Sequence, residues 1–108
     1  MKTLAKIVAI QVIATGAAFA ECAKDTAPTI PDGASSSKDQ MVAAQGAVKN
    51  YMASANAYLE CVDKSIKSSS MKSEKIKLNV AYNDTVDEMN DIAKGFNKAL
   101  RAFKKANS

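Results

Sequence analysis

The chain has 108 residues, a formal net charge of +4, and neither His nor Trp. This length allows one small domain, whose hydrophobic core is marginal by itself. The lack of His removes the commonest general base and a frequent zinc ligand, and four scattered glycines provide no phosphate-binding loop. Such a mild charge does not argue for a nucleic-acid partner. We therefore expect no enzyme and no catalytic, cofactor-binding or metal-binding residues.

The first 20 residues have the pattern of an export signal. Lys2 and Lys6 precede a mostly apolar run that ends in the small-x-small sequence Ala18-Phe19-Ala20. The run is too short to span a bilayer comfortably. We expect a signal peptide over residues 1–20 and a mature chain that is exported to the periplasm or secreted. The full chain has a net charge of +4, and the mature chain, which lacks Lys2 and Lys6, has a net charge of +2.

Two cysteines, Cys22 and Cys61, follow the expected cleavage site. In an oxidising compartment such a pair usually forms a disulfide. Lipidation of Cys22 would require a small residue directly before the cysteine, and Glu21 is charged and bulky. A bridge between two chains, or a pair of free thiols, is also compatible with the sequence.

Residues 21–36 are expected to form an extended arm. Pro28 and Pro31 fix their own backbone and bias the preceding residues away from helix. Pro31-Asp32-Gly33 is a turn signal, and Ser37 with Gln40 has the spacing of a capping box. We therefore expect the arm to end in a turn and a helix to begin near residue 38.

The first helix is expected over about residues 38–66, because its apolar positions recur every three or four residues. One row consists of Met41, Val48, Ala55 and Val62, the second of Gln45, Met52, Leu59 and Ile66, and the flank of Ala44, Tyr51 and Tyr58.

A second helix is expected over about residues 74–105, after a serine-rich connection and with Ser73 as its N-cap. Its apolar row keeps a strict 4-3 spacing and consists of Tyr82, Val86, Met89, Ala93, Phe96, Leu100 and Phe103. Two long helices with a short connection form an antiparallel hairpin. The expected fold is therefore all-α, with residues 37–108 as a coiled-coil-like two-helix hairpin domain.

The arm is long enough to return along the first helix. Ser37 to Cys61 spans about 36 Å of helix at 1.5 Å per residue. Cys22 to Gly33 reaches at most about 36–40 Å when fully extended. A nearly straight arm can therefore bring Cys22 to Cys61, which predicts an arm tied back to the hairpin by a disulfide.

Several short segments carry a resemblance. They are Cys22, Pro28-Thr29-Ile30-Pro31-Asp32-Gly33-Ala34, Met41, Val48-Lys49-x-Tyr51, Tyr58-Leu59-x-Cys61 and Phe96-Asn97. In this pattern the chain resembles a group of small exported proteins of Proteobacteria. The resemblance implies a periplasmic location, a paired Cys22 and Cys61, and a helical hairpin. It brings no activity, ligand or catalytic residue with it.

Lysines gather at both ends of the expected hairpin. Those at the turn, here called the tip lysines, are Lys64, Lys67, Lys72, Lys75 and Lys77. Basic tips suit anionic headgroups, although sparse Phe and Leu argue against deep insertion. The simpler interpretation is a solvated surface.

Four acidic residues, Asp84, Asp87, Glu88 and Asp91, share a helix face. We expect this face to lie opposite the apolar row and in solvent. A straight helix cannot wrap the six to eight oxygens that calcium prefers.

Two functional hypotheses follow. The first is a non-enzymatic structural or interaction protein of the cell envelope, acting as a homodimer or with another envelope protein. Its motivation is the long apolar row without reactive groups. The second is a binding module for anionic envelope components, such as lipid headgroups or lipopolysaccharide, through the tip lysines.

Overall fold

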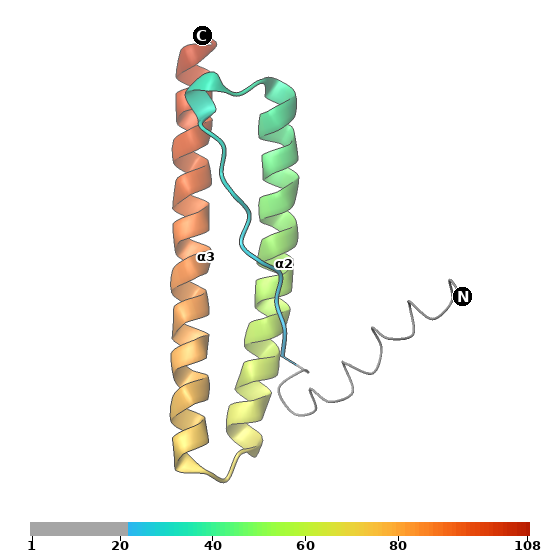
Figure 1. The fold of residues 1–108 in the computed structure, drawn as a ribbon, viewed down its shortest axis with the longest axis vertical. Coiled ribbons are helices and arrows are strands. Elements are labelled where there is room, and N and C mark those ends of the chain that lie inside the picture. Colours follow the sequence, from blue (N-terminus) through green and yellow to red (C-terminus); the bar gives the residue numbers. More distant parts are fainter. Residues whose placement is uncertain (1–21) are drawn as a thin grey trace, which may run out of the picture.

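A computed structural model describes residues 22–108, and the predicted signal peptide with its cleavage site lies outside them. Two antiparallel helices, α2 (Lys38–Ser68) and α3 (Lys72–Ala106), are joined by residues 69–71. A 3-10 helix, η1 (Gly33–Ser35), precedes α2, and the arm runs alongside the two helices, from Cys22 beside α2 to η1 beside α3 (Figure 1). The predicted all-α hairpin with a returning arm is confirmed.

The start of α2 is fixed by the predicted capping box. The Ser37 hydroxyl accepts the Gln40 N–H at 3.1 Å, and the Gln40 side chain accepts the Ser37 N–H at 2.7 Å. Together these bonds satisfy two of the N–H groups that a helix start leaves without partners. At its other end α2 continues to Ser68, two residues beyond the predicted end.

The predicted N-cap of the second helix is wrong. α3 begins at Lys72, and Met71 is the N-cap residue, without a side-chain hydrogen bond. Ser69 instead accepts the Met71 N–H at 3.2 Å, so the turn closes earlier and Ser73 lies within the first turn of α3. The helix ends at Ala106, one residue beyond the prediction.

The core is a narrow strip between the two helices and the arm. Its buried apolar side chains are Met41, Ala44, Tyr51, Ala55 and Val62 of α2 and Ala99 of α3. Thr85 of α3 is also buried, and its hydroxyl donates to the Ala81 carbonyl at 2.9 Å. That bond satisfies the hydroxyl, which would otherwise be costly to bury.

The buried strip on α2 is rotated relative to the predicted rows. Ala44 and Tyr51, expected on the flank, are buried, whereas Met52, Leu59 and Ile66 are only half-buried. On α3 the seven residues of the predicted row are all half-buried. The reason is the arm, which lies along one flank of both helices and turns that flank into core.

At Gly33 the backbone of the arm passes very close to the backbone of α3. A Cβ at this position would overlap the Ala99 carbonyl oxygen, so only glycine fits here. The Asp32 carboxylate accepts the Ala34 N–H at 3.1 Å and caps η1. The turn signal predicted at Pro31-Asp32-Gly33 is confirmed, and it reverses the chain from the arm into α2.

Candidate functional site

The arm is clamped to the hairpin at its N-terminal end by the predicted disulfide. Cys22 and Cys61 are joined, with their Cα atoms 5.4 Å apart. The Ser65 hydroxyl of the next helical turn lies 3.7 Å from the Cys22 sulfur. Because the chain has two cysteines, this bond uses both of them.

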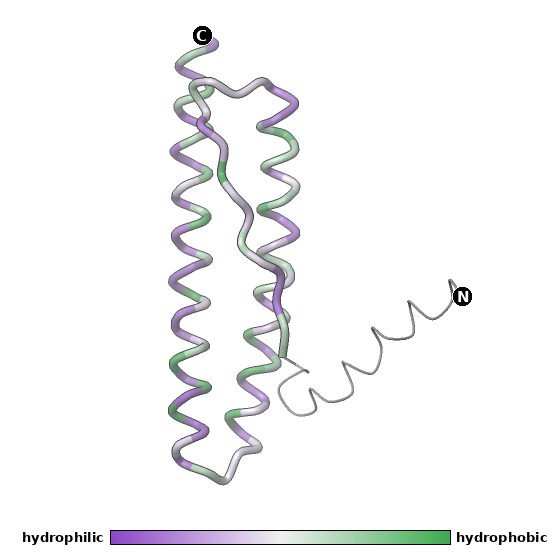
Figure 2. Tube along the Cα trace, viewed as in Figure 1, coloured by the Kyte–Doolittle hydropathy of each residue, from purple (hydrophilic) through white to green (hydrophobic). Residues whose placement is uncertain are grey.

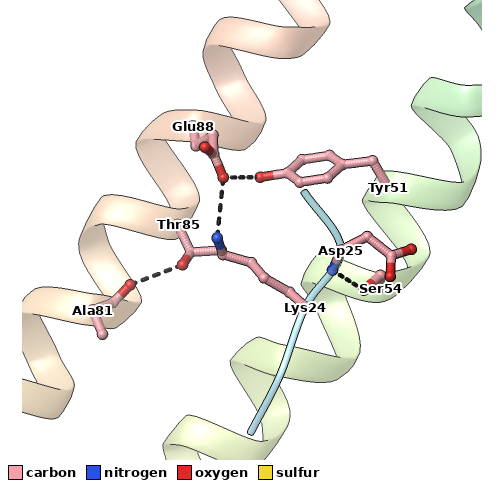
Figure 3. Close-up of polar contacts among 7 residues, drawn as sticks. All are labelled: Lys24, Asp25, Tyr51, Ser54, Ala81, Thr85 and Glu88. Atoms are coloured by element: carbon pink, nitrogen blue, oxygen red, sulfur yellow. Dashed lines mark hydrogen bonds and ion pairs between the residues drawn. The ribbon is translucent and has the colours of Figure 1, made fainter. Parts of the chain in front are cut away.

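A polar cluster next to the disulfide joins the arm to both helices (Figure 3). Tyr51 reaches from α2 and donates its hydroxyl to Glu88 Oε1 of α3. Lys24 of the arm binds the same oxygen at 3.2 Å, and its ammonium lies 5.6 Å from the centre of the Tyr58 ring. The arm backbone is held as well, since the Asp25 N–H donates to the Ser54 hydroxyl at 2.8 Å.

The electrostatics of this cluster follow from the burial of Tyr51, which is 1% exposed. Burial, followed by the hydrogen bond to Glu88 and its negative charge, raises the pKa of Tyr51 well above 10. The hydrogen bond from Tyr51, and more weakly Lys24, holds the pKa of Glu88 below 4.5, although burial opposes this. At neutral pH the cluster is therefore a neutral phenol and an ammonium on one carboxylate.

This arrangement is suited to holding the arm in place. The Tyr51 hydroxyl is committed to Glu88 and shielded from solvent, so it cannot act on a substrate. Sequence reasoning missed the cluster, although it placed Cys22 at Cys61. Lys24 follows Cys22 by two residues, and Tyr58 precedes Cys61 by three. An arm that runs antiparallel to α2 from the disulfide therefore brings Lys24 close to Tyr58, and the sequence contained this signal.

The predicted acidic face is only partly in solvent. Asp84, Asp87 and Asp91 are exposed, as expected. Glu88 is turned toward the arm and α2, where it accepts from Tyr51 and Lys24. Among residues 22–108 no three His, Cys, Asp or Glu side chains gather closely enough to hold a metal ion.

The fold brings the five tip lysines to one end of the hairpin, and each is exposed. Lys64 and Lys67 lie in the last turns of α2, and the other three lie in the first turns of α3. Lys67 pairs with Asp63 at 3.1 Å, which partly neutralises its charge. The positive charge at this end is therefore concentrated on Lys64 and the three lysines of α3.

An open groove of about 430 Å³ lies beside this end of the hairpin. It is lined by Tyr58, Met71, Ser73, Glu74, Lys77, Leu78 and Ala81. A second groove, of about 480 Å³, runs past Cys61 and Lys64. Both are shallow extensions of the helical surface, which is a form suited to contact with a surface or a protein.

No family model, curated protein or solved structure matches this chain. Within the described part of the chain, neither helix is both long and apolar enough to cross a membrane.

Proposed function

We propose that this protein is a non-enzymatic, exported protein of the cell envelope that acts by contact with other proteins, and that one of its partners is a second copy of itself. The proposal rests chiefly on one observation, a half-buried apolar face on the side of the hairpin away from the arm. This open face consists of Val48, Met52, Leu59 and Ile66 of α2 and Tyr82, Val86, Met89, Ala93 and Leu100 of α3.

Helix geometry places the open face away from the arm. Successive residues on an α-helix are rotated by about 100°. On α3, Glu88 and Ala99 lie beside the arm, so Met89 and Leu100 are carried to the other flank. On α2, Tyr58 faces the arm through Lys24, and Leu59 is displaced in the same way. No other element of residues 22–108 covers this flank.

The size of the open face suits a weak dimer. It extends over residues 48–66 of α2 and 82–100 of α3, about 28 Å of each helix at 1.5 Å per residue. At roughly 10 Å of width per helix it presents roughly 560 Å². This area is smaller than the roughly 800 Å² per partner of a standard interface and falls in the range of weak, transient complexes. Pairing two open faces would produce a four-helix arrangement with an arm on each outer side.

We expect wild-type protein to sediment as a dimer at micromolar concentration. Replacing Leu59 and Met89 with Gln places two amides in the paired face and should shift the protein to monomer, raising the dissociation constant by at least 100-fold. Val42→Gln is the matched control, because Val42 is 57% exposed and its substitution should leave the dimer intact. Sedimentation equilibrium measures all three proteins. A wild-type monomer would remove the dimer from the proposal.

Export is supported by the amino-terminal sequence pattern and by a disulfide that suits an oxidising compartment. We expect the protein recovered from the periplasm or the medium to begin at Glu21, since cleavage follows Ala20. Intact-mass measurement decides this. A diacylglycerol adduct on Cys22 would instead make it a membrane-anchored lipoprotein, and an unprocessed cytoplasmic chain would contradict export.

A further inference from the structure

Exposed apolar side chains cluster at the tip of the hairpin, defined here as residues 63–80. Four large apolar residues of the described chain are more than half exposed, and three of them belong to the tip. Met71 is 59% exposed, Ile76 57% and Val80 53%, whereas the fourth, Val42, lies in the first turns of α2, at the opposite end of the hairpin. The scarcity of Phe and Leu in this part of the sequence does not reveal these three exposed residues.

The apolar side chains of the tip are interleaved with lysines. Lys72, Ile76 and Val80 follow one another at intervals of four and so line up along the outer side of α3. Lys75 and Lys77 lie on either side of this line. Figure 2 shows strongly apolar and strongly polar positions alternating in these first turns of α3.

The net charge of the tip is positive. It contains five lysines against Asp63 and Glu74, which leaves +3. Lys67 is paired with Asp63, and Glu74 is half-buried beside the groove, so the lysines of α3 dominate the outer side. Farther along α3, the exposed Asp84 and Asp87 reverse the sign and limit the basic surface to the first turns.

We propose that the tip is a contact site for anionic phospholipid surfaces, in which Ile76, Val80 and Met71 enter the headgroup region and Lys72, Lys75 and Lys77 bind lipid phosphates. Exposed apolar side chains among lysines are the combination that holds peripheral proteins at a membrane interface. This inference goes beyond the proposed dimer and does not require it, because these residues lie outside the open face.

A lipid surface fits the tip better than a protein partner does. Three apolar side chains form a patch much smaller than the roughly 800 Å² per partner of a standard protein interface. A bilayer needs no complementary shape, and long lysine side chains adapt readily to mobile phosphates. The acidic residues at 84 and 87 keep the middle of α3 away from an anionic surface, so contact through this end of the hairpin is confined to the tip.

The test is co-sedimentation of the disulfide-bonded protein with phosphatidylglycerol vesicles at low and high salt, with phosphatidylcholine vesicles alongside. We expect binding to phosphatidylglycerol at low salt only. Each lysine near such a surface contributes about a fivefold factor, so replacing Lys72, Lys75 and Lys77 with Gln should weaken partitioning about 100-fold. Ile76→Ser with Val80→Ser should weaken it about tenfold.

Matched controls come from the opposite end of the molecule. Val42→Ser removes an equally exposed apolar side chain, and replacing Lys94, Lys98 and Lys104 with Gln removes the same charge from exposed positions of α3. Both controls should bind as wild type does. No wild-type binding, or binding lost only in the controls, would overturn the proposal. So would tip variants that keep vesicle binding but change the sedimentation state, because the tip would then be a contact between copies.

Discussion

Replacing Cys61 with Ser is expected to lower the free energy of unfolding by about 4 kcal/mol in the chain-entropy model. The Cys22–Cys61 bond spans a sequence separation of 39, and this loop is constrained in the unfolded chain as well. The total free energy of unfolding of a small domain is roughly 5–15 kcal/mol. The disulfide is therefore expected to decide whether this hairpin stays folded at physiological temperature.

Urea unfolding of oxidised, reduced and Cys61→Ser protein measures this effect. Reduced wild type and Cys22→Ser should match Cys61→Ser, because each lacks the same link. Ser65→Ala is the matched control, since it removes only the 3.7 Å contact to Cys22 and should stay near wild type. An unchanged urea midpoint after reduction, or a covalent dimer on a non-reducing gel, would contradict the intramolecular strap.

The hairpin and its arm could be predicted from the sequence because both depend on long-range regularities. The apolar spacing persists over both helices, and the Ser37–Gln40 capping box fixes where the first one begins. The path of the arm could be predicted from its length, because an extended chain from Gly33 is only just long enough to bring Cys22 to Cys61. Those constraints leave few other arrangements.

The rotation of the core could not be predicted, because apolar spacing specifies a stripe and not what lies against it. Because the arm fills one flank, Ala44 and Tyr51 are buried in the core, and Met52 and Leu59 are only half-buried. Glu88 was misplaced for the same reason. The spacing predicts that Glu88 lies opposite the apolar row and in solvent, but the arm brings Lys24 to it.

At the tip, the sequence shows which residues are apolar but not which of them are exposed. Ile76, Leu78 and Val80 alternate, which fits no single helical stripe. The structure resolves this by half-burying Leu78 beside Tyr58 and leaving Ile76 and Val80 outside. A side chain that breaks the periodic pattern is therefore a signal of exposure rather than of a weaker helix.

Replacing Glu88 with Ala is expected to cost about 3 kcal/mol, more than the change Tyr51→Phe in the same hydrogen bond. The alanine leaves the hydroxyl of a buried tyrosine without an acceptor, a cost of about 1–3 kcal/mol in addition to the lost charged hydrogen bond. Tyr51→Phe should cost about 1.5 kcal/mol, because Glu88 is 39% exposed and water can hydrate it. Asp87→Ala, one residue away and exposed, is the control and should stay within about 0.5 kcal/mol.

The same cluster should make the free energy of unfolding depend on pH in the acidic range. The folded pKa of Glu88 is lowered, so its contribution is complete above the unfolded value of 4.5 and is lost as the pH falls through the folded value. Below pH 4.5 the unfolded chain binds the proton more readily, and wild type should lose stability faster than Tyr51→Phe, in which this pKa shift is reduced. Urea midpoints from pH 3 to pH 7 measure the difference. Parallel pH curves for wild type and Tyr51→Phe would show that the phenol does not stabilise the Glu88 carboxylate. A Glu88→Ala variant as stable as Asp87→Ala would show that the contacts of Glu88 with Tyr51 and Lys24 do not stabilise the arm.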